Sequence, residues 1–170
     1  MKMSKLFSGL AYSVLGFVMV VTMARCSNEV YAQNKIDDAA TVTRIVGEQR
    51  YTFKAQTVMP STGRSRQLND NYDVSVTKDS VNSWLPYFGR AFSAPLDPTK
   101  GGIQFTSTDF EYTTAQRNDG WEITIKPKDT RDVQEMFITI FKNGTANVRV
   151  SSISRQPISF TGYITEKTGR

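Results

Sequence analysis

Apolar and polar residues alternate in short runs from Tyr51 onward, and each run stops at a turn residue. A period of two places successive side chains on opposite faces of a strand, so each run is expected to form a half-buried β-strand. About eight such runs, joined mainly by turns, predict a mainly β fold. We expect an antiparallel meander that forms a small open barrel or a sandwich.

The β region is preceded by a segment with a different pattern. Residues 33–50 begin with a polar run and then read as a linker or a short helix, which Asp37 or Asp38 would cap and Gly47 would end. A single β domain is expected over residues 51–167. The inward face of its first strand, which Pro60 stops, is predicted to carry Tyr51, Phe53, Ala55 and Thr57. The last strand is predicted to present Ile158, Phe160, Gly162 and Ile164 on one face.

Asp119-Gly120 is typical of a two-residue hairpin turn between two strands. That turn sets Ile123 opposite Gln116 and Ile125 opposite Thr114. It also places the apolar residues of both strands on one face: Phe110, Tyr112, Trp121, Ile123 and Ile125.

Asn143-Gly144 is also typical of a two-residue hairpin turn, but that turn would put Ile138 opposite Arg149. A three-residue loop over residues 142–144, with Gly144 in the left-handed conformation, keeps the apolar face continuous. This register sets Met136, Ile138 and Ile140 opposite Val150, Val148 and Ala146, respectively.

The densest aromatic stretch lies between residues 81 and 92. We expect it to form a strand that ends in a turn near Gly89. Its aromatic side chains are expected first to close the core, because aromatic burial stabilises a small β domain. Five residues here and nearby are the candidate ligand-binding site: Trp84, Tyr87, Phe88, Arg90 and Arg155. An arginine near aromatic rings can hold a carboxylate or stack on a ring, and the alternative is that each arginine closes a strand end or caps the core.

Residues 1–32 read as an export signal, because Lys2 and Lys5 precede an uncharged segment, residues 6–24, that is rich in Leu, Val and Met. Val30-Tyr31-Ala32 fits cleavage by ordinary signal peptidase after Ala32. The chain is therefore expected to be exported, to the periplasm or the cell surface.

Two alternatives to this cleavage stay open. Cys26, the only cysteine, would be lipidated after cleavage in front of it, although Arg25 departs from the usual lipoprotein pattern. An uncleaved anchor is the third reading, because the uncharged segment approaches the length that spans a bilayer. Membrane contact is expected only through the signal segment or a lipid on Cys26.

The charge balance argues against nucleic acid as a partner. The chain has 21 basic and 16 acidic residues, and loss of the signal segment leaves 18 and 15, a net charge of +3. This excess is modest, and an exported chain rarely meets nucleic acid. The expected partner is an unknown envelope protein or ligand.

The chain has no histidine, which excludes a Ser-His-Asp triad and removes the commonest metal ligand. Ser75 and Lys78 have the spacing of a lysine-activated serine, but residues three apart on a strand point to opposite faces. Two carboxylate pairs read as solvated surface acids: Asp109 with Glu111, and Asp129 with Asp132. No catalytic residue, metal or cofactor is assigned.

Four segments together resemble the domain of unknown function 4251 family: residues 85–91 (LPYFGRA), 102–107 (GIQFTS), 120–123 (GWEI) and 154–160 (SRQPISF). The match extends from about Tyr51 to Glu166. The resemblance implies a small exported or lipidated single-domain protein of Bacteroidetes, and it implies no catalytic residue because the family has no established activity. Asp79-Ser80-Val81 is also similar to a short O-glycosylation pattern of exported Bacteroidetes proteins, which makes Ser80 a candidate modification site, while a simple hairpin turn explains the same residues.

Together these observations favour a noncatalytic envelope domain that binds a protein, a glycan or an apolar ligand near residues 84–92. Two alternatives are kept: a carboxylate-dependent or Ser/Lys hydrolase, and a purely structural envelope component.

Overall fold

The computed structural model describes residue 36 and residues 38–69, 71–92 and 101–167. The predicted signal segment, its cleavage site and Cys26 lie outside these residues. No helix within the described ranges is long and apolar enough to cross a membrane.

The fold is mainly β, as the alternating pattern predicts, and the described residues form one short helix before the strands. The described elements are α2 (Ala39–Gly47), β1 (Tyr51–Pro60), β2 (Arg66–Gln67), β3 (Asp73–Val76), β4 (Val81–Leu85), β5 (Ile103–Ser107), β6 (Phe110–Gln116), β7 (Gly120–Pro127), β8 (Val133–Phe141), β9 (Thr145–Ser152) and β10 (Ile158–Glu166). The two-residue strand β2 lies in a region that the sequence predicts as a polar loop.

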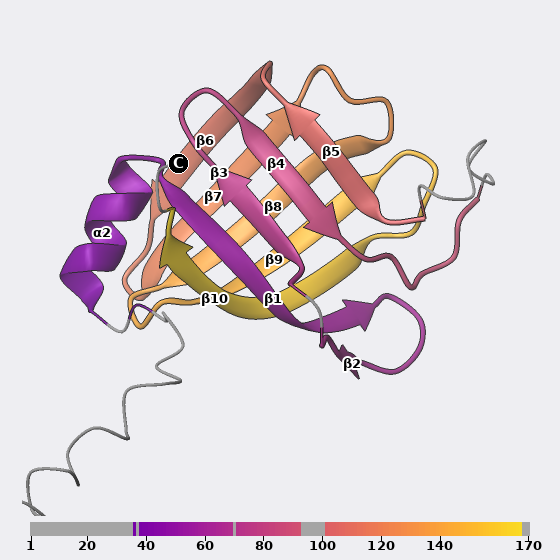
Figure 1. Ribbon diagram of the computed structural model, residues 1–170, viewed down its shortest axis with the longest axis horizontal. Coiled ribbons are helices and arrows are strands. Elements are labelled where there is room, and N and C mark those ends of the chain that lie inside the picture. Colours follow the sequence, from indigo (N-terminus) through magenta and orange to yellow (C-terminus); the bar gives the residue numbers. More distant parts are fainter. Residues whose placement is uncertain (1–35, 37, 70, 93–100, 168–170) are drawn as a thin grey trace, which may run out of the picture. The chain divides into compact units, whose positions relative to one another are not determined.

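All the strands belong to one antiparallel sheet with the order β5-β4-β3-β1-β10-β9-β8-β7-β6, and β2 pairs with β1. The sheet curls until β1, β3, β4 and β5 cross over β7, β8 and β9 (Figure 1). It is nearly closed into a barrel, which decides between the two predicted architectures in favour of the open barrel.

The barrel interior is filled by side chains from the inward faces of the long strands β1, β7, β8, β9 and β10. Phe53, Ile123, Met136, Ile138, Phe160 and Ile164 are all fully buried. The helix α2 packs against one end of the barrel (Figure 1) through Val42, Ile45 and Val46. Its start is fixed by Asp38, whose carboxylate accepts hydrogen bonds from the backbone N–H groups of Ala40 and Thr41.

The turn between β8 and β9 has the predicted three-residue form. Met136 pairs with Val150, Ile138 with Val148 and Ile140 with Ala146. Gly144 has φ 76°, the left-handed conformation that the loop requires, and a Cβ there would lie 1.9 Å from the carbonyl oxygen of Ile36. The continuous apolar face therefore identifies the register correctly.

The predicted turn between β6 and β7 is wrong by two residues in register. Arg117 pairs with Gly120 through backbone hydrogen bonds, so the turn residues are Asn118 and Asp119, not Asp119 and Gly120. Gly120 instead belongs to β7, where an added Cβ would lie 1.9 Å from the carbonyl oxygen of Ile140. The prediction of which residues share the apolar face is still correct, because a register shift of two residues leaves every side chain on the same face of the strand.

Strand β1 also departs from strict alternation. A register shift between Ala55 and Thr57 inserts one extra residue against β10. Val58 is consequently buried in the core, whereas the sequence pattern assigns that inward position to Thr57. A β-bulge bends the strand and resets which residues point inward.

The aromatic stretch does not close the core in the predicted way. Leu85 is fully buried, but Trp84 is 55% exposed and Phe92 is 71% exposed. Because β4 is a strand, Trp84 lies on the face opposite to Leu85, and its ring faces solvent. The core is completed by residues of the other strands, including the fully buried Tyr51, Phe53 and Phe160, which leaves Trp84 available for contacts outside the fold.

Candidate functional site

The outer face of β10, β1, β3, β4 and β5 carries two rows of residues that run across the strands. Residues directly opposite each other in antiparallel strands place their side chains on the same face. The alternation that sends one set of residues into the core therefore collects the intervening residues outside.

The first row, which we call the aromatic row, consists of Tyr163, Lys54, Asp73, Trp84 and Gln104. The register pairs Tyr163 with Lys54 and Lys54 with Asp73. It continues by pairing Asp73 with Trp84 and Trp84 with Gln104. One ring thus lies on each side of an ion pair, in which Lys54 Nζ is 2.6 Å from Asp73 Oδ2.

The second row, the small polar row, lies two residues further along each strand and consists of Thr165, Thr52, Ser75, Asn82 and Thr106. Its members contact one another. Thr106 Oγ1 donates to Asn82 Oδ1 at 2.6 Å, and the hydroxyls of Thr52 and Ser75 lie 3.4 Å apart. This row supplies hydroxyl and amide groups beside the rings of the aromatic row.

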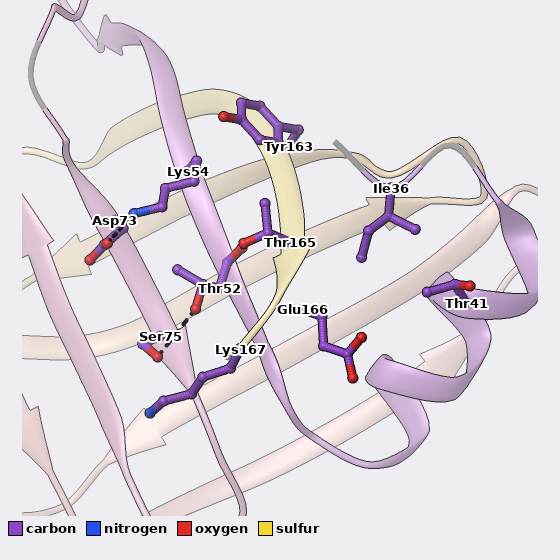
Figure 2. Close-up of a pocket in the computed structure, with 10 residues that line it drawn as sticks. All are labelled: Ile36, Thr41, Thr52, Lys54, Asp73, Ser75, Tyr163, Thr165, Glu166 and Lys167. Atoms are coloured by element: carbon purple, nitrogen blue, oxygen red, sulfur yellow. Dashed lines mark hydrogen bonds and ion pairs between the residues drawn. The ribbon is translucent and has the colours of Figure 1, made fainter. Parts of the chain in front are cut away.

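A hollow of about 830 Å³ lies over the β10 side of the two rows. Tyr163 and Thr165 of β10, Lys54 and Thr52 of β1, and Asp73 and Ser75 of β3 line it (Figure 2). Ile36, Thr41, Glu166 and Lys167 complete its lining. Most of the side chains that line it are polar.

A second hollow of about 330 Å³ lies over the β5 side of the same face. Trp84 lines it together with Asn82, Gln104 and Thr106. Asp73 lines both hollows, so they meet at the ion pair in the middle of the aromatic row.

The charges along the larger hollow balance. Lys54 pairs with Asp73, and Glu166 pairs with Arg44 of α2 at 3.0 Å. The charged side chains that line this hollow are two cations and two anions, Lys54, Lys167, Asp73 and Glu166. The face therefore presents hydrogen-bonding groups without a strong field of either sign.

The five residues that the sequence singles out are not gathered in one place. Tyr87 and Arg155 do lie together, because the Arg155 guanidinium stacks 5.1 Å from the centroid of the Tyr87 ring. Arg155 is 7% exposed, and its Nε lies 3.2 Å from Asp132. Burial raises the pKa of the Tyr87 hydroxyl, which lies 2.8 Å from the carbonyl oxygen of Arg90. These contacts fasten loops to each other and leave no open surface at the guanidinium.

Phe88 and Trp84 have separate environments, whereas Arg90 adjoins Tyr87 and Arg155 through its backbone. Phe88 is 41% exposed and packs under a different arginine, Arg66, at 5.1 Å. The side chain of Arg90 is exposed, and its backbone carbonyl accepts a hydrogen bond from Gln156. Only Trp84 of the five lines one of the hollows described above.

The members of the predicted Asp129–Asp132 and Ser75–Lys78 pairs have different partners or line different hollows, and Asp109 and Glu111 are both exposed. Asp129 accepts hydrogen bonds from Ser107 and Thr108, whereas Asp132 pairs with Arg155. Ser75 lines the larger hollow, and Lys78 lines a different one. Within the described residues, no three His, Cys, Asp or Glu side chains are grouped as a metal site requires.

Ser80 lies in the turn between β3 and β4, where its hydroxyl is 3.0 Å from the hydroxyl of Thr77 and its carbonyl oxygen accepts from Thr77. These contacts fit the interpretation of residues 79–81 as part of a hairpin turn.

Sequence reasoning missed Tyr163, Lys54 and Asp73. The available signal was that Tyr163 stands on the polar face of an otherwise regular strand, where it has no role in the core.

These features define the class of protein as a small, nearly closed antiparallel β-barrel with a filled interior and a polar outer face that carries exposed rings. The family model described as Domain of unknown function (DUF4251) matches residues 33–164, and the chain belongs to this family. The chain is also similar to the crystal structure of a DUF4251 family protein from Bacteroides eggerthii DSM 20697. The two are 17% identical with a TM-score of 0.48, over 76% of this chain and 86% of that chain. Among curated proteins, none matches the chain.

Proposed function

We propose that the chain is an exported, noncatalytic domain of the cell envelope that binds a saccharide on its outer β face. The observation that carries this proposal is Trp84, whose indole is 55% exposed beside a hollow with amide and hydroxyl walls. The C–H face of a pyranose ring stacks on an indole, and its hydroxyls pair with such polar groups.

The saccharide is favoured over the two other ligand classes by the lining of the face. An apolar ligand needs an enclosed apolar pocket, but large side chains fill the barrel interior. A protein interface generally has an apolar core of several residues inside a polar rim, whereas Trp84 and the half-buried Phe105 are the apolar residues in the lining of this hollow. A polar hollow beside an exposed indole suits a sugar better.

Export is supported by the charge pattern of residues 1–32, in which Lys2 and Lys5 precede the uncharged segment. Mass spectrometry of the protein isolated from its own cells gives the mature N-terminus directly. A start at Gln33 or a lipidated Cys26 supports export. An intact Met1 in a protein recovered from the cytoplasmic fraction would contradict export.

The binding proposal is tested with the mature protein on a microarray of neutral and acidic oligosaccharides, beside an array of peptides. Wild type and Phe92→Ala should bind the same glycans, and Trp84→Ala should bind them about tenfold less tightly. Phe92 is the matched control because its ring is 71% exposed but lines neither hollow of the outer face.

Three outcomes contradict the proposal. Absence of any bound glycan overturns it, and binding that Trp84→Ala leaves unchanged removes the assigned site. Binding to peptides alone replaces the saccharide with a protein partner. Mass spectrometry of the bound oligosaccharide checks the noncatalytic part, since shortened products would show hydrolysis.

A further inference from the structure

The two hollows of the outer face lie along a single line of paired residues. Trp84 on β4 and Tyr163 on β10 belong to the same aromatic row, separated by Asp73 and Lys54. Neighbouring strands are about 4.8 Å apart, so three steps place the two rings about 14 Å from each other. This separation exceeds the width of one sugar ring and corresponds to a short run of linked rings.

The groups between the rings suit the hydroxyls of a sugar. The side chains of Lys54 and Asp73 are 33% and 31% exposed, so the ion pair is partly open to solvent. An ammonium donates to sugar oxygens, and a carboxylate accepts from sugar hydroxyls. The small polar row runs parallel to this pair at a distance of about 7 Å, the length of two residues along a strand.

The balance of charge selects the kind of saccharide. An acidic polysaccharide would gain from Lys54 and Lys167 but would meet Asp73 and Glu166 in the same hollow. A neutral chain incurs no such repulsion, and its hydroxyls use both signs of charge as hydrogen-bonding partners.

We infer that the two hollows form one binding track, which holds an uncharged linear oligosaccharide across the strands, with Trp84 and Tyr163 as its two stacking platforms. This inference rests on the proposed function, because Trp84 is the platform that both share. It adds three points to that function: Tyr163 is a second anchor, the ligand runs across the strands, and the ligand is uncharged.

The test measures the affinity of the mature protein for cello-, malto-, xylo- and chito-oligosaccharides by calorimetry, each as a short and a long oligomer. Wild type should bind at least one long oligomer more tightly than its short form. Tyr163→Ala should weaken the long oligomer about tenfold and leave the short one unchanged, whereas Trp84→Ala should weaken both. Tyr163→Phe keeps the ring and should bind like wild type.

Phe137→Ala is the matched control, because Phe137 is 37% exposed on the outer face of β8, away from the track. If Tyr163→Ala does not fold, the test uses instead the changes in the amide chemical shifts of the wild-type protein when the oligomer is added. The long oligomer should then shift the amides of residues 161–165 in β10 as well as those of β4.

The outcomes separate the two proposals. A long oligomer that binds equally well to wild type and Tyr163→Ala, or that leaves β10 unshifted, overturns the track and leaves the Trp84 site intact. Preference for acidic over neutral oligosaccharides on the microarray overturns the neutral ligand class. If wild type binds no glycan of any length, both proposals fail.

Discussion

Arg155 Nε lies 3.2 Å from Asp132 Oδ2, with 8% of the arginine side chain and 34% of the aspartate side chain exposed. Asp132 precedes β8, and Arg155 lies between β9 and β10. The same guanidinium donates to the carbonyl oxygens of Gly101 and Gly102 at 3.1 Å and stacks on Tyr87. One buried cation therefore joins three connections between strands: β4–β5, β7–β8 and β9–β10.

Arg155→Ala is expected to destabilise the fold by about 2 to 3 kcal/mol. Removing one partner of a fully buried ion pair costs about 3 to 5 kcal/mol, and the value is lower here because solvent reaches Asp132. Loss of the stacking on Tyr87 acts in the same direction. Chemical denaturation followed by circular dichroism measures the change as a lower midpoint.

Arg90→Ala serves as the control for this prediction. The side chain of Arg90 is exposed, and its backbone carbonyl, which is the group that the fold uses, is kept in the variant. Its effect should stay within about 0.5 kcal/mol. Equal losses for the two variants would show that the buried arginine has no special role.

Asp129 should make the stability of the protein depend on pH in acid. Hydrogen bonds from Ser107 and Thr108 hold its pKa at about 2, below the ordinary 3.8. A depressed pKa in the folded state means that the unfolded chain binds the proton first as pH falls. The stabilisation is therefore complete above about pH 4 and is lost as pH falls through about 2.

Urea unfolding of wild type and Asp129→Asn between pH 2 and 6 tests this assignment. The difference between the two proteins should be constant above about pH 4 and should shrink as pH falls toward 2. A difference that does not change with pH would mean that the carboxylate does not titrate in this window.

The two hairpin turns show what an alternating sequence can predict about register. At Gly144 the competing registers differ by one residue, so the wrong one would place Arg149 opposite Ile138, and the pattern excludes it. At Gly120 they differ by two, which leaves every apolar side chain inside. There the register follows from the close approach of β8 to Gly120, since a Cβ on Gly120 would lie 1.9 Å from the Ile140 carbonyl oxygen. Such a contact cannot be read from the sequence.

The site was less predictable than the fold for the same reason. Trp84 and Tyr163 are 79 positions apart in the sequence, and they share a row only because β1 and β3 lie between their strands in the sheet. Strand order and register together decide which polar residues meet outside. The sequence pattern predicts which face a residue occupies, but it does not predict its neighbours on that face.

Gly120→Ala should destabilise the protein by about 1 to 3 kcal/mol, because the new methyl group clashes with backbone and one of the strands must shift. Gly47→Ala is the matched control. Gly47 ends α2, and an added Cβ there meets nothing within 4 Å. That variant should be unchanged or more stable by about 0.5 to 1 kcal/mol, since alanine favours the helix. Thermal melting of both variants measures the effect, and a loss in Gly47→Ala as large as in Gly120→Ala would contradict it.

The two tryptophans should respond differently to solvent and to ligand. Trp84 is 55% exposed on the aromatic row, whereas Trp121 is 7% exposed in β7. Iodide should therefore quench the emission of Trp121→Phe, which retains only Trp84, more strongly than that of Trp84→Phe.

A saturating oligosaccharide should shift the emission of Trp121→Phe to shorter wavelength and protect it from iodide, because stacking removes water from the indole. The emission of Trp84→Phe should not change, since its remaining indole is enclosed by the barrel. Equal responses from the two variants would place the ligand effect on the whole fold rather than on the outer face. A ligand that binds without altering the emission of Trp121→Phe would remove Trp84 from the site.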